Sequence, residues 1–316
     1  MTRNLFLGAD LTPAYRALAA PDAPTVLPAA VAGIFNPGEP PGMVQRTDFA
    51  TRAGGLADEI ERAQPDLIGL QEAAVWRTGD TVAADHLELL EAELARRGLR
   101  YRRVAATVNG HVALPSAVDL VVGLSDREAI LAREDPGLTL ANVRSAGFAT
   151  MLPVATPQGP VGLARGWISV DATLRGTTVR FISTHLEVSS SPAAAAVQLA
   201  QAGELLDGPT ATTLPVVMVG DFNVRPERPT YAALQAAGFD DAWTRSHPDG
   251  AAGFTCCHTE RLDDPGDTLS ARIDYIFTRG AIGATEAFLV GAEPGDFRTG
   301  LWPSDHAGVV ATLGPI

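Results

Sequence analysis

Short apolar runs alternate with amphipathic stretches along most of the 316-residue chain. The clearest run is Val216 to Val219, whose β-branched bias predicts a fully buried strand. Gly220 ends the run, and Asp221 and Asn223 follow closely. Taken alone, this Gly-Asp-Phe-Asn segment could equally form a plain turn. In strand-like geometry, however, both polar side chains point the same way, at a strand end where α/β folds gather ligand-binding groups.

The same patterns predict most of the other elements. Helical spacing predicts helices over residues 49–63, 86–97, 192–206 and 230–237. Alternation or short apolar runs predict strands over residues 2–7, 67–72, 101–108, 117–124, 129–132, 165–171, 178–185, 271–278, 284–290 and 309–313. Residues 117–124 and 129–132 are expected to pair around residues 125–127. A proline-rich loop is expected from the end of the first strand to about residue 42, and residues 20–42, with six prolines, have its richest loop composition.

Strands and helices alternate in both halves, without a repeat or a linker, which predicts one α/β domain over residues 1–316 and a monomer. The formal net charge of -13 argues against an extended basic face for nucleic acid. A bound divalent cation could still bring a phosphate to an acidic surface.

No apolar run is long enough to span a membrane, and the N-terminus shows no export signal. We therefore expect a soluble chain, secreted if a leader has been removed, and the sequence assigns no compartment. The adjacent Cys256 and Cys257 fit no zinc pattern with His258. Packing or surface thiols are the favoured interpretation, and a vicinal disulfide is the alternative.

Eight polar residues lie at strand ends or inside apolar strands. They are Asn4, Glu72, His185, Asp221, Asn223, Asp274, Asp305 and His306. Carboxylates, amides and imidazoles without cysteine suit Mg²⁺ or Mn²⁺ rather than structural zinc. Such a set can activate water, stabilise phosphoryl oxygens and assist a leaving oxygen, as phosphodiester hydrolysis requires. Motifs for zinc proteases, serine hydrolases, P-loops and dinucleotide binding are absent from the sequence.

The motifs TRNLFLG, QE, STHLE, GDFN, RIDYIF and SDH follow one another along the chain. Together they resemble the endonuclease/exonuclease/phosphatase superfamily, a metal-dependent group that includes DNase I-like nucleases, abasic-site endonucleases, inositol-polyphosphate phosphatases and neutral sphingomyelinases. The resemblance implies a four-layer α/β sandwich, with two central mixed β-sheets flanked by helices.

The resemblance also implies residue roles at a metal ion. Glu72 resembles the principal Mg²⁺ ligand, Asn4 resembles the first-strand amide that assists at the metal, and Asp305 resembles a metal-side acid. Asp126 lies near the region where relatives carry a carboxylate partner for the middle histidine, and it is the loosest match.

Further roles are implied around the substrate phosphate. His185 resembles the histidine that contacts the scissile phosphate. Asp221 and Asn223 resemble the pair that handles the proton and hydrogen-bonds a phosphoryl oxygen. Asp274 resembles the carboxylate that orients His306. Because accounts of the family differ on the general base, Asp221 and His306 are assigned together as a coupled acid/base set.

The sequence thus predicts a Mg²⁺-dependent phosphodiesterase, with a nuclease-type substrate as the default. Alternatives are a sphingomyelinase-like or phospholipase C-like enzyme and a small-molecule phosphodiesterase or phosphatase. A membrane-acting enzyme would expose an apolar loop, for which residues 34–35, Phe297 and residues 301–302 are candidates. A non-catalytic binding module on the same fold is the alternative of another class.

Overall fold

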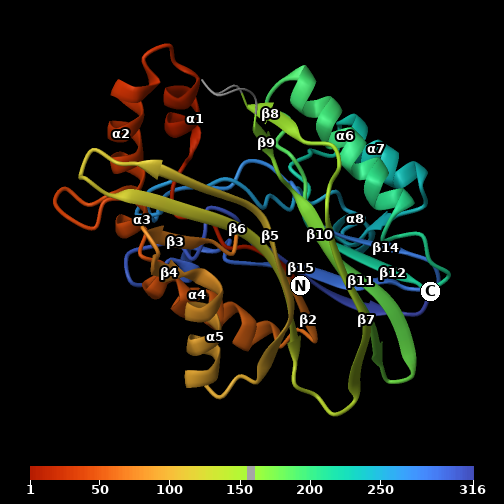
Figure 1. Ribbon diagram of the computed structural model, residues 1–316. Coiled ribbons are helices and arrows are strands. Elements are labelled where there is room, and N and C mark those ends of the chain that lie inside the picture. The colour runs from red at the N-terminus through yellow and green to blue at the C-terminus, as the bar shows by residue number, and fades with distance from the viewer. Residues whose placement is uncertain (155–160) are drawn as a thin grey trace.

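The computed structural model describes residues 1–154 and 161–316 and shows two β-sheets packed face to face between helices (Figure 1). The first sheet has the order β15-β16-β1-β2-β6-β3-β4, with β5 paired to β6, and the second has the order β13-β14-β12-β11-β10-β7. Both sheets are mixed, because β1 and β2, like β11 and β12, run parallel while the other pairs are antiparallel. The predicted fold class is therefore confirmed.

The strands of the first sheet are β15 (Gly283–Val290), β16 (Gly308–Gly314), β1 (Thr2–Asn4), β2 (Leu67–Gln71), β6 (Val121–Arg133), β3 (Val75–Thr78), β4 (Thr81–Asp85) and β5 (Tyr101–Pro115). Those of the second sheet are β13 (Asp240–Asp241), β14 (Asp274–Arg279), β12 (Val216–Asp221), β11 (Thr177–His185), β10 (Gly166–Leu174) and β7 (Leu138–Gly147). A separate pair consists of β8 (Leu152–Val154) and β9 (Val161–Leu163).

The helices are α1 (Thr12–Ala19), α2 (Ala23–Ile34), α3 (Met43–Arg46), α4 (Phe49–Ala63), α5 (His86–Arg96), α6 (Pro192–Asp207), α7 (Pro229–Ala236) and α8 (Ala242–Ser246), with a 3₁₀ turn at Pro294–Asp296. The four helices predicted from periodicity are confirmed as α4, α5, α6 and α7. The Ser191 hydroxyl caps α6 by accepting from the Ala194 amide at 3.2 Å. Within the described ranges, no helix has the length and apolar composition to cross a membrane.

Apolar side chains fill the space between the layers. Helices α4 and α5 bury Leu56 and Leu90 against the outer face of the first sheet. Helices α6 and α7 bury Leu205 and Leu234 against the second sheet. The two sheets approach closely at Gly69, where an added Cβ would lie 2.5 Å from a Val219 methyl group. This close packing fixes the strand ends of one sheet relative to the other.

The loop predicted for residues 20–42 is wrong, because this segment contains α2. Pro24 lies in the first turn of α2, where a helix tolerates proline. Leu27, Val31 and Ile34 follow at helical spacing and are buried in a cluster that contains Trp76. Figure 1 shows α1 and α2 together at one end of the molecule, above β3 and β6.

The strand pair predicted around residues 125–127 is also wrong, because residues 121–133 form the single strand β6. Its neighbour β5 continues through Asn109 and Gly110 to Pro115, and it pairs with β6 along this whole length. Asp126 therefore lies in the middle of a ladder, opposite Gly110. Residues 125–127 are polar and therefore resembled a turn. The pattern of their own segment does not reveal that β5 pairs with them.

Candidate active site

Three neighbouring strands of the second sheet bring three of the site residues to one level. His185 on β11 lies opposite Asp221 on β12, and Asp221 lies opposite Asp274 on β14. All three side chains are buried. Gly220 precedes Asp221 because a Cβ at this position would overlap the carbonyl oxygen of Thr184. The ladder register therefore places the imidazole of His185 on β11 level with the carboxylates of Asp221 on β12 and Asp274 on β14.

The first sheet supplies the facing half of the cluster. Asn4 at the end of β1 lies opposite Gln71 on β2, so that Glu72 follows directly. The Asn4 amide donates to Asp221 Oδ2 at 3.1 Å and thereby joins the two sheets. Glu72 and Asn223 have φ angles of 56° and 50°, a left-handed conformation that is uncommon outside glycine and concentrates at functional sites.

His306 lies among three carboxylates. Its Nδ1 is 2.8 Å from Asp274 Oδ2, and its Nε2 is 3.9 Å from both Asp221 Oδ2 and Asp305 Oδ1. Burial lowers the pKa of His306, but Asp274 and Asp305 outweigh burial, so that the pKa lies well above its usual value. Burial, followed by the charge of Asp274, raises the pKa of Asp221 to about 7. The Asp274 contact holds the ring with Nε2 facing Asp221.

Glu72 and Asp305 form the acidic side of the cluster. Leu7 donates its amide to Glu72 Oε2 at 2.8 Å, and Ser304 donates its hydroxyl to Asp305 Oδ1 at 3.3 Å. Burial and then the charge of Asp305 raise the pKa of Glu72, and burial raises the pKa of Asp305. Two partly buried carboxylates that repel each other are an arrangement that a hard divalent cation would relieve.

A second group of potential ligands overlaps this one. Carboxylate oxygens of Asp221 and Asp274 and a ring nitrogen of His306 all lie within 4.8 Å of one another. Since Asp274 already occupies His306 Nδ1, we interpret this group as an acid and imidazole network rather than as the primary cation site. The donor set of the whole cluster, mainly oxygen atoms with the imidazoles of His185 and His306, fits a hard cation.

Asp126 does not contact His185 directly, because Arg165 lies between them. Arg165 Nη1 is 3.2 Å from Asp126 Oδ2 and 2.9 Å from His185 Nδ1. A guanidinium group only donates, so Nδ1 must accept and a neutral His185 carries its proton on Nε2. Burial and then the Arg165 charge lower the pKa of His185 well below its usual value. His185 is therefore a neutral imidazole that presents Nε2–H.

The surroundings of that Nε2–H are polar. Asp221 Oδ2 lies 3.5 Å away and Asn223 Nδ2 lies 3.0 Å away. The Asn223 amide already donates to the carbonyl oxygen of Leu186 at 3.0 Å. Because two N–H groups cannot bond to each other, Nε2–H remains available to Asp221 or to an incoming oxygen atom.

Two residues that hold the site together were not predicted from the sequence. Arg165 was not singled out, although it precedes Gly166, which lies opposite His185 in the β10 and β11 ladder. Thr255 accepts from the backbone amides of Ile273 and Asp274, each at 3.1 Å, and so fixes the start of β14. No signal in the sequence pattern points to Thr255.

The favoured interpretation of Cys256 and Cys257 as thiols is wrong, because a vicinal disulfide joins them. The backbone of Cys256 forms bridges to Ala271 and His306, but the extended pairing does not continue at Cys257. Because the two sulfur atoms are bonded, they lie on one side of the backbone rather than on opposite sides. The neighbouring imidazole is that of His306, not of His258.

The two central sheets, with a buried polar cluster at their facing strand ends, define a DNase I-like α/β sandwich. The sequence profile described as the Endonuclease/Exonuclease/phosphatase family matches residues 44–306. The chain belongs to this family. No curated protein sequence matches it.

Solved structures share this fold at low sequence identity. A humanized Danio rerio TDP2 is 18% identical with a TM-score of 0.57, covering 84% of this chain and 92% of that one. An endonuclease/exonuclease/phosphatase from Beutenbergia cavernae is 20% identical with a TM-score of 0.61, covering 99% and 71%. A mannosyl-6-phosphatase from Bacteroides thetaiotaomicron is 18% identical with a TM-score of 0.57, covering 85% and 93%. At these identities the likeness concerns the fold.

Proposed function

We propose that the chain is a phosphodiesterase that depends on Mg²⁺ or Mn²⁺. The contacts of Asp221 carry this proposal, because groups from both sheets meet at its Oδ2 atom. Asn4 lies at 3.1 Å, His185 at 3.5 Å and His306 at 3.9 Å. A carboxyl group with a pKa of about 7, coupled to an imidazole, suits proton transfer near neutral pH.

Glu72 and Asp305 would hold the cation, with Asn4 beside them. When bound, the cation would neutralise charge on a phosphoryl oxygen and orient the substrate. The chain's own residues would perform the proton chemistry. Asp221 and His306 form the coupled acid/base set, and Asp274 holds the His306 ring through Nδ1 at 2.8 Å.

Two side chains can bind the phosphoryl oxygens directly. The neutral His185 presents Nε2–H, and the Asn223 amide lies beside it at 3.0 Å. These are donors whose positions are fixed before the substrate binds, the arrangement that stabilises developing negative charge most effectively. Neither group has to change its protonation state to do so.

A nuclease-type diester remains the default substrate. One structural neighbour is a D. rerio TDP2 complexed with a single-strand DNA product, and another is a mannosyl-6-phosphatase, so a small phosphate ester is the second candidate. The net charge of -13 favours a short substrate over a long duplex. A sphingomyelinase-like activity loses support, since Ile34, Phe35 and Trp302 are buried.

An activity panel with and without EDTA tests the proposal. It comprises bis(p-nitrophenyl) phosphate, plasmid DNA, RNA, sphingomyelin and mannose 6-phosphate. We expect diester hydrolysis that EDTA abolishes and that Asp221→Asn lowers by about 10²- to 10⁴-fold. Asp263→Asn, the same change at a surface aspartate, is the control. Activity that survives both EDTA and Asp221→Asn contradicts the assignment, and Mg²⁺ binding without turnover would indicate a binding module.

A further inference from the structure

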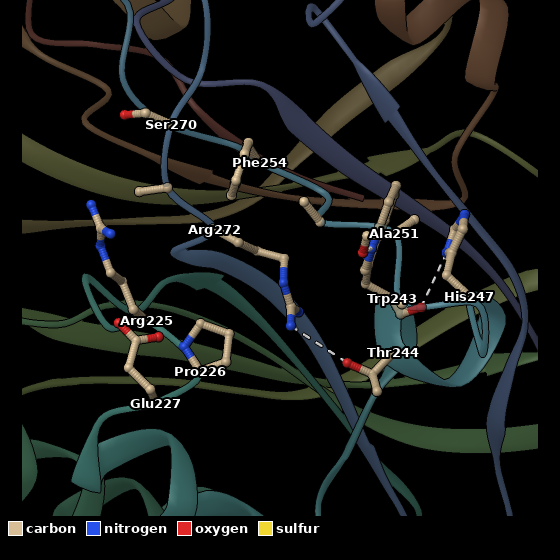
Figure 2. Close-up of a pocket in the computed structure, with 13 residues that line it drawn as sticks. Arg225, Pro226, Glu227, Trp243, Thr244, His247, Ala251, Phe254, Ser270 and Arg272 are labelled. Atoms are coloured by element: carbon tan, nitrogen blue, oxygen red, sulfur yellow. Dashed lines mark hydrogen bonds between the residues drawn. The ribbon is translucent and has the colours of Figure 1, made fainter.

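A hollow of about 310 Å³ is lined by residues that include Arg225, Trp243, Phe254 and Arg272 (Figure 2). Arg225 lies two residues after Asn223, and Arg272 lies two residues before Asp274. Because consecutive Cα atoms are 3.8 Å apart, each arginine Cα lies within about 8 Å of the Cα of its catalytic neighbour. Two lining residues of the hollow therefore belong to the segments that carry Asn223 and Asp274.

One wall of the hollow is rigid. The Trp243 ring stacks on His247, with 3.9 Å between centroids and 14° between planes, and its Nε1 donates to the Ala251 carbonyl oxygen at 2.8 Å. The guanidinium of Arg272 forms an ion pair with Asp241. The wall is thus formed in advance, and the charge of Arg272 is already balanced.

Two other side chains that line the hollow, Phe254 and Arg225, are free to contact a ligand. Phe254 is 45% exposed, a large fraction for an aromatic side chain. Gly253 has a φ of 60° and packs against the Trp243 ring, which fixes the position of Phe254 beside that wall. Figure 2 shows no hydrogen bond from Arg225 to the other lining residues. Within residues 1–154 and 161–316, Arg225 has no ion-pair partner.

We infer that this hollow binds the nucleobase of a nucleotide whose phosphate lies in the catalytic cluster, an inference that rests on the proposed function. An exposed aromatic face stacks on any base, and a guanidinium donates to base or phosphate oxygens. About 310 Å³ lies at the small end of ligand pockets and accommodates one planar group rather than a lipid chain. The acidic surface limits the substrate to a short oligonucleotide or a nucleotide ester.

Three diesters with the same leaving group test the inference. They are the p-nitrophenyl phosphates of methanol, of the hexose 6-hydroxyl and of the thymidine 5′-hydroxyl. We expect kcat/KM for the thymidine ester to exceed that for the methyl ester by about 5- to 100-fold, the range that stacking of one base supplies. Phe254→Leu should remove most of this preference, and Phe254→Tyr should retain it. Phe288→Leu, at another exposed phenylalanine, is the matched control.

Equilibrium binding of thymidine 5′-monophosphate, followed by tryptophan fluorescence, examines the hollow without turnover. Binding that Phe254→Leu weakens and Phe254→Tyr preserves supports the nucleobase site even if no diester is hydrolysed. Hydrolysis without a thymidine preference, or an equal preference for the hexose ester, overturns the nucleobase site and leaves the proposed function intact. Equal losses in Phe254→Leu and Phe254→Tyr also overturn it.

Discussion

Arg165 offers the sharpest test of how the site is organised. Arg165→Met keeps an unbranched apolar side chain but removes the donor to His185 Nδ1, which lies 2.9 Å away. A hydrogen bond with a charged donor contributes about 1.5 to 3 kcal/mol. The preference of His185 for the Nε2–H tautomer should weaken by that amount. We therefore expect kcat/KM on bis(p-nitrophenyl) phosphate to fall by about 10- to 150-fold.

Nitrogen NMR of His185 measures this positioning role directly, because the two neutral tautomers have different nitrogen shifts. The wild-type protein should show Nε2–H, and Arg165→Met should show a mixture. Arg180→Met is the matched control, since Arg180 pairs with Asp171 on the same two strands, away from the catalytic end. This control should lose stability and keep both the tautomer and kcat/KM.

Removing Arg165 also leaves Asp126 without its 3.2 Å partner, and because both side chains are only partly buried, an unpaired carboxylate there costs about 1 to 3 kcal/mol. The double variant Arg165→Met with Asp126→Asn separates the two effects. It should recover much of the lost stability, measured by urea denaturation, without recovering the tautomer. If Arg165→Met retains pure Nε2–H and a kcat/KM close to the wild-type value, the positioning role is refuted.

Two further predictions concern stability. Gly69→Ala should lower the free energy of unfolding by about 1 to 3 kcal/mol, because the new methyl group would press on Val219. Urea denaturation measures this change. An unchanged free energy of unfolding would show that the sheets can separate at no cost. Burial lowers the pKa of His258 from 6.5 to about 4, so the unfolded chain binds the proton first as the pH falls. Stability should thus decrease by at most about 3 kcal/mol between pH 6.5 and 4. His258→Phe, which can still stack on Trp302, should remove that part of the pH dependence, and an identical pH profile would contradict the reasoning.

The sequence pattern predicted where the strands end, but it did not predict the strand pairing and register that bring the residues at these ends together. His185, Asp221 and Asp274 lie on one level because β11 is parallel and β14 antiparallel to β12. Residues far apart in the chain can meet there only through these ladders. The apolar runs predicted only the strands. That the site residues lie close together was predicted from the order of the motifs, which resembles that of the family.

Arg165 and Asp126 show what the pattern could not reveal. Each looked like an ordinary polar residue near a strand, and their importance arises from a contact across two sheets. Asp126 lies on β6 of the first sheet, whereas Arg165 lies next to β10 of the second. Such a pair has no local signature, because neither residue changes the periodicity of its own segment. The helices α1 and α2 were missed for a different reason. Pro13 and Pro24 lie in first turns, where proline favours a helix as readily as a loop, and Pro28 lies inside α2, where proline normally disfavours a helix.

In the proposed function, the two sheets would supply different parts of the chemistry. Glu72 and Asp305, which would hold the cation, flank strands of the first sheet, whereas His185 and Asp221 end strands of the second. The bond of Asn4 to Asp221 at 3.1 Å connects the two parts. The packing of the two sheets sets the position of the cation-holding residues relative to His185 and Asp221. A substitution between the sheets should therefore lower kcat/KM even when it is too mild to unfold the chain. We therefore expect the close contact at Gly69 to contribute to the geometry of the proposed active site as well as to stability.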